Sequence, residues 1–131
     1  MSDFSENNSA SQDISFVVVG DEDMLRPNEV AEVVIEEDSV LICNSEGQYY
    51  AIQNLCTHDN APLGLGRLIG WEIECSRHGA KFDVTSGEES SEWMLQSLVT
   101  FPLRIRDGKI EVQYTKPEPP AFRLIGDRNQ G

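Results

Sequence analysis

Four side chains in two short segments of the chain are candidate metal ligands. A single residue separates Cys56 from His58, and two residues separate Cys75 from His78. The whole chain has two histidines and three cysteines, so these segments contain both histidines and two of the cysteines. Each segment therefore offers one thiol and one imidazole, the side chains that soft and borderline metal ions prefer.

The spacing within each segment allows both of its side chains to face one centre. In extended backbone, residues i and i+2 point the same way, so Cys56 and His58 can do so without a turn. Cys75 and His78 are three residues apart and require a turn. Gly79 follows directly and tolerates the positive φ that such a turn needs. We therefore expect two loops that present their ligands to a common site.

Two kinds of metal centre use two cysteines and two histidines. In one kind of [2Fe–2S] cluster, two histidines replace two cysteines on one of the irons. A structural zinc site uses the same residue types, but its usual order is a Cys pair followed by a His pair with wider gaps. Here the types alternate, and one residue between Cys56 and His58 is tight for tetrahedral chelation. The order favours the cluster, and zinc remains the alternative.

The sequence around these segments resembles a known family over residues 16–114, about three-quarters of the chain. The motifs are Cys-Thr-His at 56–58, Ile-Glu-Cys-Ser-Arg-His-Gly-Ala-Lys-Phe-Asp at 73–83, and Thr-Ser-Gly at 85–87. They are similar to those of Rieske-type ferredoxins that serve bacterial aromatic-ring dioxygenases. Many members have proline after the second ligand cysteine, where this chain has Ser76.

This resemblance implies one Rieske-type [2Fe–2S] cluster and its ligand set. Cys56 and Cys75 would bind one iron, and His58 and His78 the other. Two thiolates balance the charge of the oxidised core, so the cluster is neutral when oxidised and carries one negative charge when reduced. A four-thiolate cluster is more negative in both states. Imidazole ligation therefore makes an electron easier to accept.

Four further positions indicate the subclass. The Rieske proteins of quinol-oxidising respiratory complexes have an extra cysteine in each cluster loop, joined as a disulfide, whereas Ala61 and Arg77 occupy these positions here. Those proteins also place hydroxyl groups near the cluster, where hydrogen bonds to sulfur raise the potential. Ala80 and Phe82 offer no such donor. We expect a reduction potential at the low end of the Rieske range, about −150 mV.

Short β segments with turn signals between them must position the two loops. We expect strands at Phe16–Val19, Val30–Glu36, Ser39–Cys43, Gln48–Gln53, Trp71–Glu74, Ala80–Asp83, Leu103–Arg106 and Lys109–Gln113. Hairpins are expected over 44–47 and 107–108, and the first ligand loop over 55–66. Residues 90–98 are expected to be a loop or a single helical turn. No segment has a convincing helical period.

This pattern predicts an all-β sandwich or barrel. The resemblance implies a Rieske fold of antiparallel sheets, with a small cluster-binding subdomain built from the two ligand loops. The cysteines would face inward, and the histidines would lie near the surface. Pro62, Leu63 and Leu65 follow the first ligands and would form either an apolar collar around the cluster or ordinary loop packing.

Length and composition predict one domain with two extensions. We expect a flexible acidic leader at 1–14, the Rieske domain at 15–115 and a Pro-rich tail at 116–131. The net charge of −13 argues against binding to nucleic acid or to an anionic membrane. The longest apolar runs are too short to span a bilayer. Cys43 has no partner for a structural disulfide and lies in an apolar run, so we expect a buried thiol and a cytoplasmic protein.

The expected function is that of a soluble one-electron carrier in aromatic hydrocarbon catabolism. Its partners would be a flavoprotein or other NAD(P)H-dependent reductase and a terminal Rieske non-heme iron oxygenase. No histidine is left for a second iron site or a nucleophile–base pair, so we expect neither an enzyme nor a small-molecule substrate. The alternatives are a small subunit of a nitrite reductase, a ferredoxin linked to iron–sulfur assembly, and, in another class, a zinc-stapled binding module.

The alternating ligand pairs lead to a prediction about metal content. The purified protein should contain about two irons and two acid-labile sulfides per chain. The reduced protein should give an EPR signal with nitrogen hyperfine coupling from His58 and His78. Stoichiometric zinc without labile sulfide would show instead that the chain is a zinc module.

Overall fold

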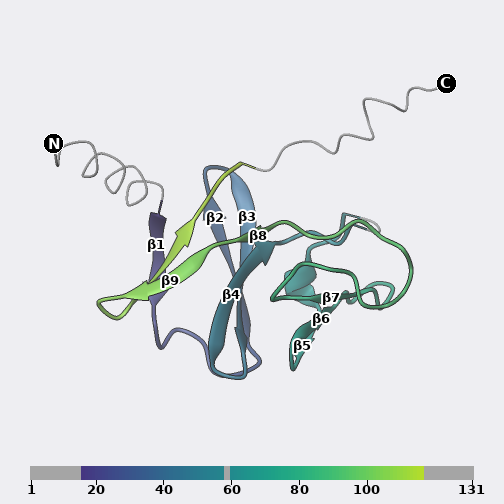
Figure 1. Cartoon of the computed structure of the whole chain (residues 1–131), viewed down its shortest axis with the longest axis horizontal. Helices are drawn as coiled ribbons and strands as arrows, with labels where there is room; N and C mark the ends of the chain where they lie inside the picture. Colours follow the sequence, from purple (N-terminus) through teal and green to yellow (C-terminus); the bar gives the residue numbers. More distant parts are fainter. Residues whose placement is uncertain (1–15, 58–59, 117–131) are drawn as a thin grey trace, which may run out of the picture.

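The computed structural model describes residues 16–57 and 60–116, and its strands form three antiparallel sheets (Figure 1). The first sheet joins β1 (Phe16–Asp21), β10 (Lys109–Gln113) and β9 (Leu103–Arg106) in that order. The second joins β2 (Val30–Ile35), β3 (Asp38–Ser45), β4 (Gln48–Gln53) and β8 (Thr100–Phe101). The third joins β5 (Arg67–Ile69), β6 (Glu72–Glu74) and β7 (Lys81–Asp83). The all-β prediction is confirmed.

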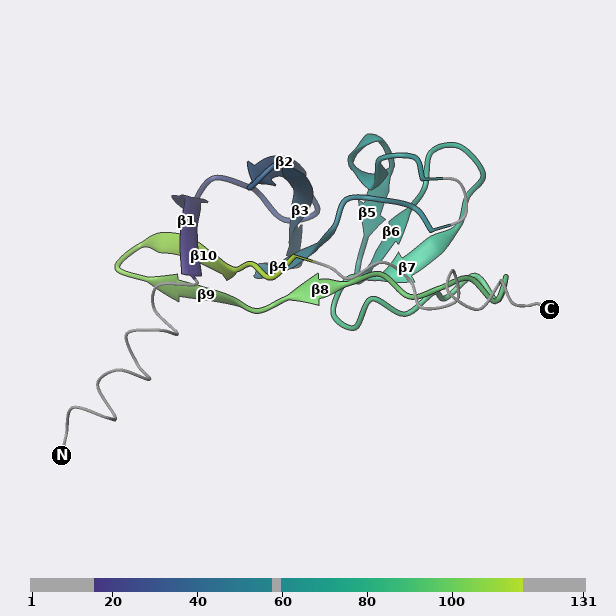
Figure 2. The ribbon, with the colours of Figure 1, turned by 90° about the horizontal axis from the view of Figure 1, so that it is seen from above.

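The third sheet forms a small subdomain at one end of the molecule, opposite β1, β9 and β10 (Figure 2). Both predicted ligand loops connect to strands of this third sheet. The first runs from β4 to β5 and contains the only regular helical element of the described residues, the 3₁₀ turn η1 (Leu63–Leu65). The second connects β6 to β7. The described residues contain no helix long and apolar enough to cross a membrane.

Three of the predicted strands, β4, β9 and β10, have the predicted bounds. The others differ by one or two residues at one end, or at both ends in the case of β3. Two strands were not predicted. β5 and β8 have only three and two residues, too few to show an alternating pattern. Residues 90–98 are a loop without a helical turn. The predicted leader and nearly all of the predicted tail lie outside the described residues.

Three hairpins turn over two residues that both have positive φ: Glu36-Glu37, Glu46-Gly47 and Asp107-Gly108. Positive φ at both central residues is typical of type I′ turns, whose twist matches that of the flanking strands. The turn after β2 is unusual because φ is 51° at Glu36 and 78° at Glu37, a region that β-carbon-bearing residues disfavour. Glu36 was predicted to end the strand but is instead the first residue of this turn.

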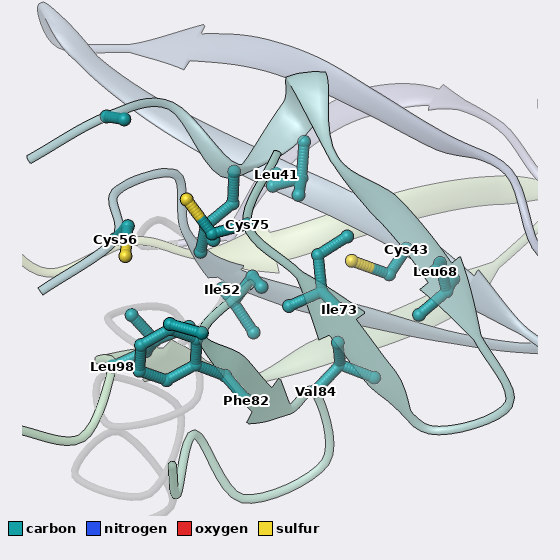
Figure 3. Close-up of a cluster of buried hydrophobic side chains, with 13 residues drawn as sticks. Leu41, Cys43, Ile52, Cys56, Leu68, Ile73, Cys75, Phe82, Val84 and Leu98 are labelled. Atoms are coloured by element: carbon teal, nitrogen blue, oxygen red, sulfur yellow. The ribbon is translucent and has the colours of Figure 1, made fainter. Parts of the chain in front are cut away.

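The central strand β3 contributes to two hydrophobic cores, one on each of its faces. Leu41 and Cys43 pack into the first core, which lies against the third sheet (Figure 3). Val40 and Ile42 pack into the second core, with residues of the first sheet such as Val112. All four β3 side chains are fully buried. Because alternate residues of a strand point to opposite faces, this single apolar run joins the subdomain to the rest of the molecule.

The Glu36-Glu37 turn leads to a stability prediction. Replacing the pair by Asn-Gly should raise the free energy of unfolding by about 1 kcal/mol, because these residues accept positive φ. The midpoint of thermal unfolding should then rise by about 4–8 °C. The double variant E36Q/E37Q is the matched control, since it removes the same charges and keeps the backbone cost. Equal midpoints for the two variants would show that charge, not backbone strain, is responsible.

Candidate metal centre

The two predicted ligand cysteines lie together in the first core. Cys56 is 0% exposed and Cys75 is 2% exposed, and both belong to the same cluster of buried side chains. Figure 3 shows the two sulfur atoms toward one end of this core and Cys43 toward the other. All three cysteines are free thiols. The inward orientation predicted for the ligand cysteines is therefore confirmed.

The first ligand loop folds into a tight turn around Cys56. Its backbone N–H donates to the carbonyl of Ala61 at 2.8 Å, and its carbonyl accepts from the N–H of Asn60 at 2.7 Å. Asn60 has a φ of 65°. Asparagine is one of the few residues with a side chain that adopt this conformation readily. Asn60 was not among the predicted site residues, although its residue type is a signal for such a turn.

The second ligand loop repeats the same turn around Cys75. The N–H of Cys75 donates to the carbonyl of Ala80 at 2.8 Å, and the carbonyl of Cys75 accepts from the N–H of Gly79 at 3.0 Å. Gly79 has a φ of 82°, as its position after the ligands predicted. In both loops the partners lie five and four residues after the cysteine. The two cysteines are thus presented by equivalent backbone turns.

The imidazole of His78 is exposed, in contrast to the buried thiol of the same loop. His58 lies outside the described residues. Among the described residues, no three Cys, His, Asp or Glu side chains converge closely enough to hold a single metal ion. A [2Fe–2S] cluster does not require such convergence, because each of its irons takes only two protein ligands.

The setting of the two thiols fits a metal cluster. An isolated thiolate in an apolar core carries a large desolvation cost, and a bound cation offsets this cost. A hollow of about 300 Å³ also opens against Cys75, between the two ligand loops. It is lined by Leu65, Gly66, Arg67, Glu74, Cys75, Ser76 and Gly79. The buried thiol of Cys75 thus lies beside an open hollow, which provides a route by which a cluster could enter.

The predicted alternatives for the first loop were an apolar collar and ordinary loop packing. The structure gives Pro62, Leu63 and Leu65 different surroundings. Leu63 is fully buried in the first core, so its role is packing. Leu65 is 73% exposed, and Pro62 is exposed as well. Only Pro62 and Leu65 therefore remain available for an apolar collar.

A third segment, residues 89–98, is attached to the first ligand loop. The hydroxyl of Thr57 donates to the carbonyl of Gln96 at 2.6 Å. The carboxylate of Glu89 accepts from the N–H of Trp93 at 2.7 Å and from that of Leu95 at 3.1 Å. Although desolvation by itself raises the pKa of Glu89, hydrogen bonds from Ser91 and from these backbone groups outweigh it and lower the pKa. Glu89 thus organises a segment that the sequence did not connect with the site.

The comparisons with known proteins agree with this geometry. The model of the Rieske [2Fe-2S] domain matches residues 15–102. The chain belongs to this family. Membership favours a Rieske-type [2Fe–2S] cluster over the zinc alternative, and the cluster makes the chain an electron-transfer protein.

Sequence relatives of this Rieske protein include ferredoxin components of dioxygenase systems. It is 34% identical over 84 residues to the ferredoxin component of the naphthalene 1,2-dioxygenase system of Pseudomonas putida, with 64% of this chain and 81% of the relative covered. It is 32% identical over 95 residues to the biphenyl dioxygenase ferredoxin subunit of Pseudomonas sp. (strain KKS102), with 72% and 87% covered. These relatives are electron-transfer components, not the catalytic subunits of their systems.

Solved structures give the same assignment. The ferredoxin of Sphingomonas yanoikuyae B1 superposes with a TM-score of 0.71 at 28% identity, with 76% of this chain and 98% of that one covered. The ferredoxin of carbazole 1,9a-dioxygenase from Nocardioides aromaticivorans IC177 gives a TM-score of 0.72 at 27% identity, with the same coverage. The predicted Rieske fold with its cluster-binding subdomain is confirmed.

The burial of the thiols leads to a prediction about cysteine reactivity. Desolvation raises the pKa of Cys43 to about 12. At pH 8 only about one such thiol in ten thousand is ionised, so it should not react with iodoacetamide. The native holoprotein should therefore remain unlabelled, and the unfolded, metal-free chain should take up three labels. Labelling is measured by mass spectrometry.

Substitution separates Cys43 from the two proposed ligands. Cys43→Ala should retain the visible absorbance of the cluster, because the thiol of Cys43 only packs against apolar neighbours. Cys56→Ala and Cys75→Ala should each lose this absorbance. A colourless Cys43→Ala variant would contradict the assignment of Cys43 to packing alone.

Proposed function

We propose that this Rieske ferredoxin takes single electrons from an NAD(P)H-dependent reductase and delivers them to a terminal Rieske non-heme iron oxygenase. The observation that carries the proposal is the opposite burial of two neighbouring ligands. Cys75 is buried in the core, whereas the imidazole of His78 is exposed at the end of the molecule. This arrangement suits a metal centre that buried cysteines bind and that a partner protein approaches from the exposed histidine side.

In the proposed ligand set, Cys56 and Cys75 hold the cluster, and His58 and His78 complete it. When bound, the cluster supplies one reversible electron. The core around the two thiols surrounds them with apolar side chains. The exposed edge of His78 gives a partner protein a short path to the centre. Ala61 and Arg77 leave no possibility of the disulfide found in the respiratory subclass, which is consistent with the expected low potential.

The relatives support the identity of the partners. Two of them are named as ferredoxin components of naphthalene and biphenyl dioxygenase systems. A solved structure that superposes with a TM-score of 0.69 at 28% identity is a complex of oxygenase and ferredoxin in carbazole 1,9a-dioxygenase. By analogy, the oxygenase served by this chain would act on an aromatic ring, and the carrier would work in the cytoplasm.

The surface near the second ligand loop is suited to transient docking. Arg77 is exposed beside His78, and Leu65, which lines the hollow next to this loop, is 73% exposed. Apolar contact at the centre of such a surface excludes water, and charge around it speeds encounter. The net charge of −13 would steer the carrier toward basic surfaces on its partners.

The charge leads to a prediction about electron-transfer rates. The second-order rate of oxygenase reduction should fall as ionic strength rises, because salt screens the attraction between the acidic carrier and a basic partner. Stopped-flow absorbance measures this rate. A rate that does not depend on salt would reject steering, although the carrier role would stand. A protein that no reductase can reduce would reject the carrier role itself.

Arg77 provides a local test of the same surface. Arg77→Gln should keep the cluster absorbance and change the rate with the oxygenase by more than about twofold, because the side chain lies in the contact. Arg26→Gln is the charge-matched control, since Arg26 lies in the exposed segment between β1 and β2. Loss of the cluster in Arg77→Gln would show that Arg77 supports the loop from within.

A further inference from the structure

The two ligand loops contain the same internal turn, but their ends are closed in different ways. The second loop is closed by the β6–β7 ladder, in which Glu74 pairs directly with Lys81. The first loop starts from β4 in the second sheet and ends at β5 in the third sheet. Because these strands belong to different sheets, no ladder joins the two ends of the first loop. Another interaction must hold them together.

The side chain of Asn54 makes that interaction. Its Oδ1 accepts a hydrogen bond from the backbone N–H of Gly64 at 2.9 Å, which closes the loop of residues 55–63. Its Nδ2 donates to the hydroxyl of Ser39 on β3 at 2.9 Å, and its backbone N–H donates to the Ser39 carbonyl at 3.2 Å. Asn54 is only 8% exposed. One buried amide therefore ties both ends of the first ligand loop to the central strand.

Gly64 needs this partner because it lies in the 3₁₀ turn η1. The first N–H groups of a helical turn have no acceptor within the turn and are normally capped by the preceding side chain. Here the N-cap is Pro62, whose side chain makes no capping hydrogen bond. Asn54 takes over this role from a position ten residues away in the sequence. A buried N–H left without an acceptor would destabilise the turn.

The capped turn also places a side chain in the core that contains the two candidate ligand cysteines. Leu63, the residue before Gly64, is fully buried in the same core as Cys56 and Cys75. Gly64 itself is closely surrounded, since an added β-carbon would lie 3.1 Å from Leu41 Cδ1. A shift of η1 would therefore disturb the core in which the two thiols are buried.

From this geometry we infer that Asn54 is a positioning residue that sets the placement of Cys56 through the backbone of the first ligand loop. The inference rests on the proposed ligand role of Cys56. The hydrogen-bond chain continues outward, because the hydroxyl of Ser39 donates to the Glu32 carboxylate at 2.5 Å. Ser39 thus orients Asn54, and Asn54 is the member of this hydrogen-bond chain that bonds to the ligand loop.

Substitution at Asn54 separates positioning from general stability. Asn54→Leu has a similar size and lacks both polar groups, whereas Asn54→Asp keeps the Oδ1 acceptor for Gly64 and can accept from Ser39 if that hydroxyl turns from Glu32. We expect Asn54→Leu to lose the cluster to a chelator about fivefold faster than the wild type, the factor that corresponds to one hydrogen bond. The EPR g-values and the nitrogen coupling of the reduced cluster should also change. Asn54→Asp should keep the EPR spectrum of the wild type.

Val112→Ala is the control for lost stability, because Val112 packs in the second core, away from both ligand loops. It should lower the unfolding midpoint without changing the EPR spectrum. The positioning role is overturned if Asn54→Leu keeps the wild-type spectrum, or if its cluster loss equals that of a control variant of the same midpoint. If Asn54→Leu does not fold, Asn54→Ser, which is too short to reach Gly64, takes its place.

Hydrogen exchange distinguishes this inference from the proposed function. In the holoprotein, a peptide covering residues 55–66 should exchange faster in Asn54→Leu than in the wild type, and a peptide covering 75–83 should be unchanged. This readout does not depend on any redox partner. Failure of electron transfer to an oxygenase with the expected exchange pattern would reject the partner assignment only. Unchanged exchange in 55–66 would reject the positioning role only.

Discussion

The structure depends on the burial of both faces of β3. Val40 and Ile42 fill one core, and Leu41 and Cys43 fill the other. A slip of one residue in the register of this strand would exchange the two sets of side chains, so both cores fix the same pairing with β4. The cluster-binding subdomain has only short strands of its own, and it is stable because its apolar side chains complete a core that β3 and β4 begin.

The proposed site places two kinds of candidate ligand in two kinds of environment. The thiols of Cys56 and Cys75 lie in the core, and the imidazole of His78 is exposed. Since buried thiolates require a cation, binding of the cluster and folding of the subdomain are coupled. The same burial leaves the histidine side as the accessible side of the centre. Metal retention and access for partners are thus obtained from one orientation of the loops.

The two ligand loops are equivalent in their turns and different in their support. A strand ladder closes the second loop, and β6 and β7 place it as part of a sheet. Single side chains support the first loop: Asn54 contacts Gly64 at its end, and Thr57 contacts the 89–98 segment near its start. The first loop can therefore be altered by single substitutions, whereas the second follows the geometry of its sheet.

The sequence by itself determined the fold class and the candidate ligand residues. The chain has only two histidines, each close to a cysteine, so few kinds of metal site are possible. The apolar run 40–43, with turn signals around it, indicated a buried strand. The hairpin over Asp107-Gly108 was predicted because its turn chemistry is local. These features depend on residues close together in the chain, where pattern and conformation are directly linked.

Only the tertiary structure decided the features that depend on distant residues. β5 and β8 are too short to show a pattern and exist because a neighbouring strand pairs with them. The Glu36-Glu37 turn adopts positive φ against the preference of glutamate, because the pairing of β2 with β3 requires it. The bond between Asn54 and Gly64 joins residues whose types do not indicate a contact. Long-range packing selects such features, and no local pattern specifies them.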